Sequence, residues 1–235
     1  MRYIRKGEEP ESFTDWKERQ KNRGNPVTWK AFRRRVTVKN DVYDALLREQ
    51  GFICCYCGMQ ITRDTSHFEH FKPKSNITYG HLVLDYKNLL VSCKGESKGS
   101  EESKDSEESE EEHRVPVHCG HKKDDWYDEH LMVSPLDENC ASFFRYAASG
   151  EILPTDVPDK KEAAQTTIEK LGLGIEKLRL MRSAAIDGAL LAIEGLTDEE
   201  TLLFAQGYEK PDANGQYEEF CAAIAYILTQ YFREA

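Results

Sequence analysis

Residues 52–73, FICCYCGMQITRDTSHFEHFKP, carry the densest chemistry of this 235-residue chain. The stretch begins with a C-x2-C knuckle, Cys54 and Cys57, and ends with two histidines and a glutamate just before Pro73. Short runs of β-forming residues lie on either side of polar turn residues, which predicts a small, loop-rich β structure. So small a core needs the folding free energy that a bound metal supplies, and we expect the knuckle to hold one.

Two cysteines further along the chain can complete a tetrahedral four-thiolate zinc site. Cys93 and Cys119 are 26 positions apart, but both can reach the knuckle, because the entropy of loop closure grows only with the logarithm of loop length. Cys55 leaves the register of the knuckle open, and His118 beside Cys119 is an alternative ligand. The predicted ligands of a structural Zn²⁺ are Cys54, Cys57, Cys93 and Cys119, with Cys140 and Cys221 as core residues.

The composition indicates a soluble protein of a reducing compartment. No apolar run approaches the roughly 18 residues that cross a membrane, and the opening residues MRYIRKGEEPESF contain no apolar signal region. We therefore expect a cytoplasmic protein with no membrane partner. In the cytoplasm, seven cysteines favour metal ligation or buried thiols over disulfides.

The net charge of −10 is distributed unevenly along the chain. Residues 1–75 hold 16 Lys and Arg against 10 Asp and Glu, giving +6, which suits contact with phosphates. A solvated helix face is the equally strong alternative for the arginine run of this segment. Residues 96–112, ESKGSEESKDSEESEEE, contain no apolar side chain and predict a disordered insert. The candidate contacts to a nucleic-acid backbone in the basic segment are Arg33, Arg34, Arg35, Lys72 and Lys74.

The segment His67-Phe68-Glu69-His70 places a carboxylate between two imidazoles. Hydrolysis of a phosphodiester needs a base that deprotonates water and a cation that neutralises charge on the phosphate, and neighbouring Glu and His side chains supply both. Glu69 would bind the cation and His70 would be the base. His67 lies on the same side as Glu69 if the segment is extended, and we interpret it as a strand residue rather than as part of the site.

Four blocks of the sequence resemble the HNH, or ββα-metal, nucleases. They are CCYC (54–57), FEHFKPKS (68–75), YKNLLVSC (86–93) and HCGHKK (118–123). More narrowly, the chain resembles the PtuB family of Septu and retron-associated anti-phage systems, which operate beside an ABC-type ATPase called PtuA. The opening MRYIRKGEEP, the stretch REQGFICCYC and the later TIEKLGLGIEKLRLMR extend this resemblance over nearly the whole chain.

The resemblance implies a role for several residues. Glu69 matches the acidic ligand of a catalytic Mg²⁺ or Mn²⁺, His70 the general base, and Asn88 the asparagine that holds the loop bearing the base. Pro73 matches the proline of the motif, which has a structural role. At the last motif position the sequence departs from the pattern, because Gly120 stands where a ligating His or Asn is usual. The candidate second ligand is therefore His121, with Asp124 as the alternative. Lys123 matches a lysine that could contact phosphate.

The expected fold is α+β, with a zinc-stapled ββα-metal core between two helical parts. Residues 1–50 form a basic helical arm in which Asn40 or Asp41 caps a helix that ends at Gly51, and residues 51–126 form the core with its insert. Residues 127–235 form a hairpin that turns at Ser149-Gly150, followed by a helical lobe. Within the lobe, Thr197 and Glu200 predict a capping box. The last helix, about 217–232, carries an apolar stripe that we interpret as core, with a docking face for a partner as the alternative; its residues are Tyr217, Phe220, Cys221, Ile224, Leu228 and Tyr231.

These features predict a metal-dependent endonuclease that acts on nucleic acid, with DNA favoured over RNA. The resemblance adds a PtuA-like ATPase partner and a role in anti-phage defence. A zinc-binding interaction module with a degraded catalytic centre is the main alternative. A nucleobase deaminase, which His67-Phe68-Glu69 also suggests, lacks the later P-C-x-x-C that such enzymes require. The acidic insert is either an inert loop or a segment that covers the basic surface and restrains cleavage.

Overall fold

The computed structural model describes residues 1–95 and 116–231, so the predicted acidic insert 96–112 lies outside the described residues. The fold is α+β, as the sequence predicts, with helices around two separate two-stranded antiparallel sheets. Among the described residues, no helix is both long and apolar enough to cross a membrane.

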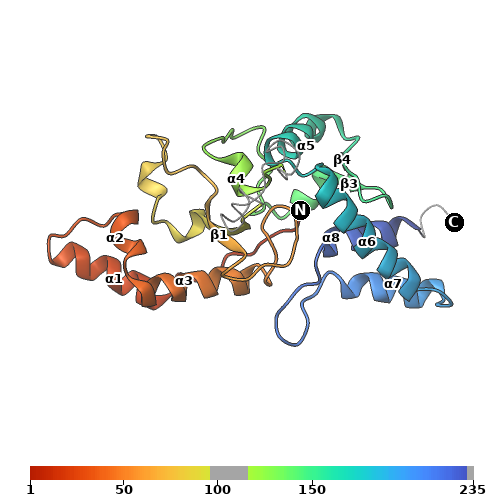
Figure 1. The fold of residues 1–235 in the computed structure, drawn as a ribbon, viewed down its shortest axis with the longest axis horizontal. Helices are drawn as coiled ribbons and strands as arrows, with labels where there is room; N and C mark the ends of the chain where they lie inside the picture. Colours follow the sequence, from red (N-terminus) through yellow and green to blue (C-terminus); the bar gives the residue numbers. More distant parts are fainter. Residues whose placement is uncertain (96–115, 232–235) are drawn as a thin grey trace, which may run out of the picture.

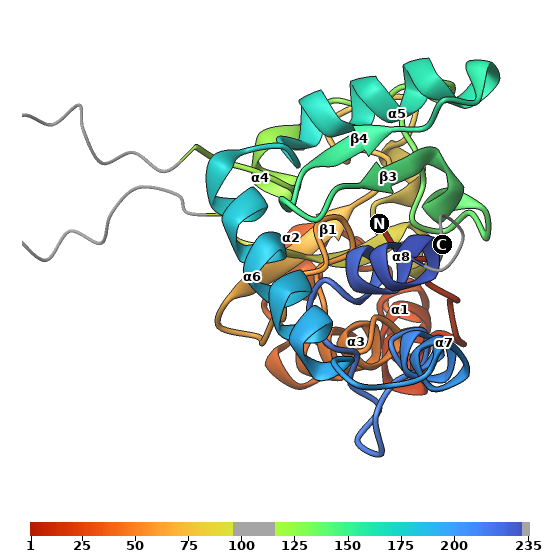
Figure 2. The ribbon, with the colours of Figure 1, turned by 90° about the vertical axis from the view of Figure 1, so that its right-hand side faces the viewer.

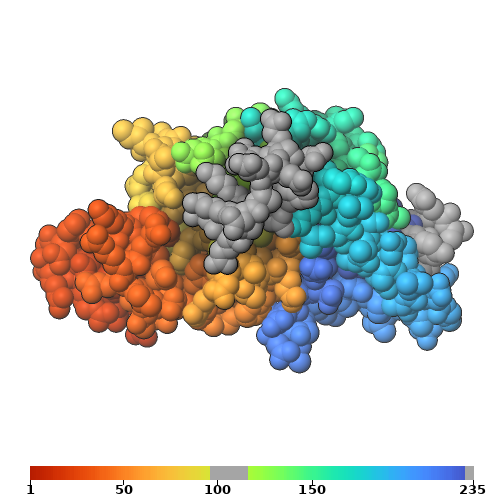
Figure 3. Space-filling view, viewed as in Figure 1, coloured from red at the N-terminus to blue at the C-terminus, as the bar shows by residue number. Residues whose placement is uncertain are grey.

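The N-terminal helices form one end of the elongated molecule, and the C-terminal helices form the other (Figures 1 and 3). Three aromatic rings, those of Phe13, Trp16 and Phe32, pack with centroids 4.9 to 6.0 Å apart and join the first two helices. A further ring, that of Trp29, extends this cluster towards the centre of the molecule. The helices of this arm are α1 (Glu11–Asn22), α2 (Trp29–Arg33) and α3 (Val36–Glu49).

Helix α3 begins earlier than the predicted cap at Asn40 or Asp41. The amide of Lys39 already donates to the carbonyl of Arg35, and no side chain caps the helix. The predicted start was wrong because a polar residue acts as a cap only where the backbone leaves the helix, and here the helix continues through both positions. At the other end, Gly51 follows the helix with a φ of +60°, so the predicted end is confirmed.

The central sheet pairs β1 (Ser66–His70) with β2 (Leu89–Cys93), and a four-residue helix, α4 (Gly120–Lys123), follows in the described chain. Glu69 lies opposite Leu90, and His67 lies opposite Ser92. All five residues of β2 are buried. Two short 3-10 helices, Gly80–Leu82 and Tyr86–Asn88, shape the loop between the strands.

The outer edge of β2 is closed by a side chain. The side-chain NH2 group of Gln50 donates to the carbonyl of Val91 at 2.8 Å, and its side-chain oxygen accepts from the Val91 amide at 2.7 Å. The side chain thus bonds to β2 as a neighbouring strand would. It also donates to the carbonyl of Ile53 at 2.9 Å. Gln50 is only 2% exposed, so it anchors the end of the arm to both the sheet and the cysteine knuckle.

The C-terminal part begins with the predicted hairpin. Strands β3 (Phe144–Tyr146) and β4 (Ile152–Pro154) pair around a turn at Gly150, whose φ is +81°. Figure 2 shows α5 (Pro158–Leu171) lying along β4. The helices α6 (Glu176–Ala192), α7 (Asp198–Gly207) and α8 (Cys221–Tyr231) follow, and the predicted capping box of Thr197 and Glu200 opens α7.

Helix α8 starts four residues later than the sequence indicates. The amide of Tyr217 donates to Gly51 and that of Phe220 to Gly58, so this segment pairs with the loops of the core instead of coiling. Phe220 also has a φ of +55°, which a helix does not accept. The predicted boundary was wrong because these tertiary contacts override a helical pattern of side chains.

Two hydrophobic clusters stabilise the described chain. The larger one extends from the N-terminal helices through the central sheet to α5, and the smaller one joins α6, α7 and α8. Phe220, Ile224 and Leu228 belong to the smaller cluster, so this part of the predicted stripe is core.

Replacing Gln50 with Leu should lower the free energy of unfolding by about 1–3 kcal/mol, because it leaves the buried amide of Val91 without a partner and its carbonyl with only the amide of Cys55. Urea denaturation of the zinc-loaded protein measures the change. Gln60→Leu is the matched control, since Gln60 is exposed and its loss should change stability by less than about 0.5 kcal/mol. Equal stability of the two variants would contradict the role given to Gln50.

Candidate metal and catalytic centre

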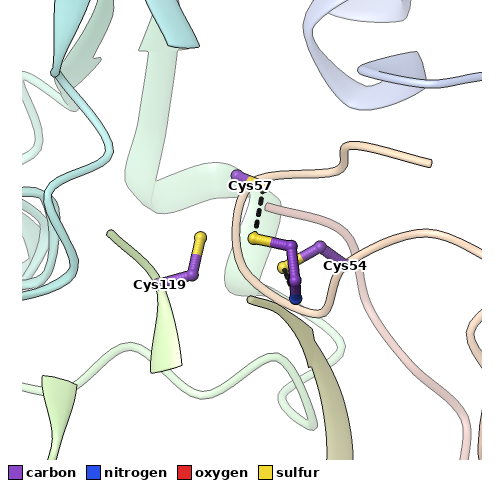
Figure 4. A group of neighbouring side chains, drawn as sticks. Cys54, Cys57 and Cys119 are labelled. Carbon is purple, nitrogen blue, oxygen red and sulfur yellow. Dashed lines mark hydrogen bonds between the residues drawn. The ribbon is translucent and has the colours of Figure 1, made fainter. Parts of the chain in front are cut away.

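Four cysteine sulfurs converge between the central sheet and α4. Cys54 and Cys57 come from the knuckle, Cys93 ends β2, and Cys119 directly precedes α4. Their sulfur atoms all lie within 4.8 Å of one another. Figure 4 shows Cys54, Cys57 and Cys119 pointing toward a common centre. The structure thus brings together the four cysteines that the sequence singles out, with Cys54 and not Cys55 in the knuckle.

The donor set and its spacing fit zinc. Zinc–sulfur bonds of about 2.3 Å in a tetrahedron place neighbouring sulfurs about 3.8 Å apart. The Cys57 and Cys93 sulfurs are 3.8 Å apart. Hydrogen bonding from Cys119 lowers the pKa of Cys93 to about 7, so one thiolate is already available near neutral pH. The cluster could therefore bind a metal such as zinc.

Polar groups around the sulfurs link them to the rest of the centre. The Nδ1 atom of buried His118 lies 3.2 Å from the Cys119 sulfur and 3.6 Å from that of Cys93. The Cys93 amide donates to the sulfur of Cys54 at 3.3 Å. The neighbouring Ser92 hydroxyl accepts from the amide of Gly120 at 3.0 Å, which ties the first residue of α4 to β2. His118 therefore lies against two of the sulfurs as a hydrogen-bonding neighbour.

Glu69 is a buried carboxylate whose two oxygens differ. Its Oε1 accepts hydrogen bonds from the Tyr56 hydroxyl at 3.0 Å and from the Lys123 ammonium at 2.9 Å. Its Oε2 lies 3.7 Å from Nε2 of His67. Burial raises the pKa of Glu69, but His67 and Lys123 outweigh it, so the pKa is lowered overall and the group is ionised. Oε2 is therefore the oxygen that remains for a cation.

Lys123 is completely buried, and its ammonium donates to the carbonyl of His70 at 3.0 Å as well as to Glu69. In this position it holds the carboxylate and the end of β1 together and does not reach the surface. The sequence assigned Lys123 to phosphate contact, whereas the structure places it as the counter-ion of Glu69.

His70 lies at the end of β1, on the side that faces the N-terminal arm. Its Nε2 is 3.1 Å from the carbonyl of Val83, and its ring meets the edge of Trp29 with centroids 4.5 Å apart. Burial lowers the pKa of His70 to about 4, so the imidazole is neutral at pH 7. With Nε2–H donating to Val83, the Nδ1 lone pair is the one that can accept a proton.

Asn88 closes the loop that follows the base. Its side-chain oxygen accepts from the Lys72 amide at 2.8 Å, and its NH2 group donates to the carbonyls of Lys72 and Leu82. The Phe71 amide donates to the backbone carbonyl of Asn88. These bonds fix residues on both sides of the loop, and the role of Asn88 in the catalytic centre stays a prediction.

The remaining predicted site residues lie nearer the surface. His121 is exposed and its ring stacks on His67 at 4.3 Å, and exposed Asp124 donates its amide to Gly120. Arg33, Arg34 and Arg35 are exposed at the junction of α2 and α3. Lys74 is exposed, and Lys72 lies over the rings of Tyr79 and Tyr127 at 5.2 and 5.5 Å.

One residue of this centre was missed by the sequence reasoning, and another was interpreted differently. Tyr56, inside the CCYC knuckle, donates to Glu69, and nothing in its local sequence signals that contact. His67 lies beside the free oxygen of Glu69, on the side of the strand that its i, i+2 spacing predicted, although the sequence favoured a strand residue over a part of the site.

Comparison with known proteins finds a relative named as an HNH endonuclease. No family model matches the chain. The chain is similar to a Vibrio cholerae protein (serotype O1, biovar El Tor) named "Retron Vc95 putative HNH endonuclease", with 33% identity over 153 residues. The match covers 64% of this chain and 65% of the relative, so it spans slightly less than two thirds of that protein. The resemblance to HNH endonucleases is confirmed by this relative, whereas the narrower resemblance to PtuB stays a prediction.

Cys57→Ala should lose bound zinc and unfold at a lower temperature, because three thiolates hold the ion less well than four. The measurements are metal content by mass spectrometry and thermal unfolding. Cys221→Ala is the matched control, since Cys221 is buried but does not belong to the four-sulfur group. Unchanged zinc content in Cys57→Ala would contradict the site.

Lys123→Met should destabilise the zinc-loaded protein by about 3–5 kcal/mol in the absence of other added cations, because it leaves the buried charge of Glu69 without its cation. Lys122→Met, at an exposed position of the same helix, should have little effect. Chemical denaturation of both variants checks this expectation, and a Lys123→Met variant as stable as the control would refute the counter-ion role.

Proposed function

We propose that this chain is a zinc-stapled, metal-dependent HNH-type endonuclease that hydrolyses phosphodiester bonds, acting in the cytoplasm. The observation that carries the proposal is the pairing of a neutral, oriented imidazole at His70 with an ionised carboxylate at Glu69, adjacent on one strand. Similarity to a protein named as an HNH endonuclease supports the same reaction. We take the two strands and α4 to be the ββα-metal core of such an enzyme.

The proposed chemistry divides between the two side chains. His70 takes a proton from the attacking water on its Nδ1, while the carbonyl of Val83 holds the opposite edge of the ring. Glu69 would hold a Mg²⁺ or Mn²⁺ ion through Oε2. The bound cation supplies charge neutralisation at the scissile phosphate. Asn88 keeps the loop after the base closed.

The exposed cations near His70 are the proposed contacts to the nucleic-acid backbone. Trp29, which touches the base, and Arg33 are four residues apart on α2 and so share one face of the helix. A nucleic-acid strand bound along that face of α2 would pass from His70 to the three consecutive arginines, Arg33, Arg34 and Arg35. Lys72 and Lys74 lie in the loop that directly follows β1, close in sequence to His70. DNA remains the favoured substrate, as the sequence predicts.

The biological setting follows from resemblance alone. The relative's name refers to a retron, and the sequence resembles the PtuB proteins of anti-phage systems. We therefore propose that the chain is a defence effector that works with a PtuA-like ABC-type ATPase.

A second candidate function is a zinc-binding interaction module of such a complex. The observation in its favour is Gly120, which offers no side chain to a cation at the last motif position. Such a module would keep its anti-phage effect without His70, whereas a nuclease would lose it.

His70→Ala should reduce cleavage by about 10²–10⁴-fold, the usual contribution of a general base. The assay uses plasmid, single-stranded DNA and total RNA with Mg²⁺ or Mn²⁺, with and without the ATPase partner. His130→Ala is the control, because His130 is an exposed loop residue. Cleavage that persists at full rate in His70→Ala, with zinc content unchanged, would refute the assignment.

A further inference from the structure

Gly120 is glycine for reasons of space. A Cβ atom at this position would lie 2.5 Å from Oε2 of Glu69 and 2.7 Å from Nε2 of His67, far inside ordinary contact distance. Gly120 is absent from the glycines with positive φ, so its backbone does not demand glycine. What the missing side chain allows is the approach of one carboxylate oxygen and one imidazole nitrogen to each other, directly beneath the start of α4.

These two atoms have the arrangement of a pair of ligands. Their separation of 3.7 Å is too long for a hydrogen bond. Two donors on one cation, each about 2.1 Å from it, lie about 3.0–3.4 Å apart, so a shift of a few tenths of an ångström would let both bind. The other oxygen of Glu69 is already occupied by Tyr56 and Lys123, which leaves Oε2 directed at His67.

The imidazole of His67 is not held in place by hydrogen bonds of its own. Its side chain is three-quarters buried, at 25% exposure, and its buried Nδ1 has no hydrogen-bond partner among the described residues. A largely buried imidazole without a hydrogen bond of its own is unusual in a structural role, because buried polar groups are normally satisfied. A cation bound at Nε2 would supply the anchor that the ring lacks.

His121 plays a different part. Its ring lies parallel to that of His67, at 13°, with centroids 4.3 Å apart, so it packs on the face of His67. Exposed His121 therefore supports the ring of His67 from the side.

We infer that the second protein ligand of the catalytic cation is His67, and that His121 only positions it. This inference rests on the proposed function and deepens its metal site. One carboxylate oxygen and one imidazole nitrogen leave most positions of an octahedral ion open to water and to a phosphate oxygen. The carboxylate oxygen suits Mg²⁺ or Mn²⁺, and the imidazole favours a transition metal, so Mn²⁺ is the better match of the two; the thiolate set, in contrast, selects zinc.

The test measures Mn²⁺ affinity of the zinc-loaded chain by electron paramagnetic resonance, with no nucleic acid present. His67→Ala should weaken the affinity at least about 10-fold, and His121→Ala by less than about 3-fold. Zinc content should stay at the wild-type level in both variants, which shows that the core is intact. Equal affinity in His67→Ala and wild type overturns the inference, as does an equal loss in the two variants.

Gly120→Ala provides a second test that keeps His67. Its Cβ should separate Oε2 of Glu69 from Nε2 of His67 and weaken Mn²⁺ binding at least about 10-fold. Gly188→Ala in α6 is the control, because no atom lies within 4 Å of its added Cβ and its backbone is helical. Wild-type Mn²⁺ affinity in zinc-loaded Gly120→Ala overturns the inference even if His67→Ala does not fold.

The outcomes separate this inference from the proposed function. If the wild-type chain cleaves nucleic acid but His67→Ala and Gly120→Ala bind Mn²⁺ normally, the nuclease stands and the ligand assignment falls. If the chain cleaves no substrate but the two variants lose Mn²⁺, the cation site stands and the nuclease falls. Absence of Mn²⁺ binding by wild-type protein at millimolar concentrations overturns the ligand assignment directly.

Discussion

The convergence of four cysteine sulfurs is the constraint on which the rest of the centre depends. The knuckle, the end of β2 and the start of α4 meet there, although Cys93 and Cys119 are 26 positions apart in the sequence. Among the residues that the structure describes, no hydrogen-bonded ladder joins these three segments to one another, and α4 is too short to be stable alone. Ligation of one ion by all four sulfurs would fix where α4 begins, and with it the positions of Gly120 and Lys123.

The carboxylate at Glu69 shows how the same frame prepares a buried charge. Lys123 from α4 and Tyr56 from the knuckle both bind one oxygen, so the two segments that converge at the cysteines also meet at this side chain. The arrangement neutralises part of the charge while leaving the second oxygen exposed to a ligand. His70 is controlled from the opposite side, by Trp29 of the arm and the carbonyl of Val83. The carboxylate and the imidazole are thus positioned by different parts of the chain.

The sequence predicted those features that depend on local pattern or on a strong chemical signature. The hairpin at Gly150, the capping box at Thr197 and the convergence of the four cysteines belong to this group. Prediction from the sequence failed where contacts between distant segments determine the local structure. Helix α8 starts late because residues 217–220 pair with Gly51 and Gly58. The burial of Lys123 and the contact of Tyr56 with Glu69 were beyond it for the same reason. A motif position identifies a residue type, whereas its neighbours in space determine whether a lysine meets solvent or a carboxylate.

The glutamine at the outer edge of β2 has a consequence for how the protein meets other copies of itself. A two-stranded sheet normally exposes backbone groups along both sides, and such rows are where chains pair and aggregate. Here Gln50 occupies the amide and carbonyl of Val91 on one side, and the amide of Cys55 also donates to that carbonyl. A foreign strand would have to displace a buried side chain before it could join. The backbone groups of Val91 at this edge are therefore shielded against intermolecular pairing.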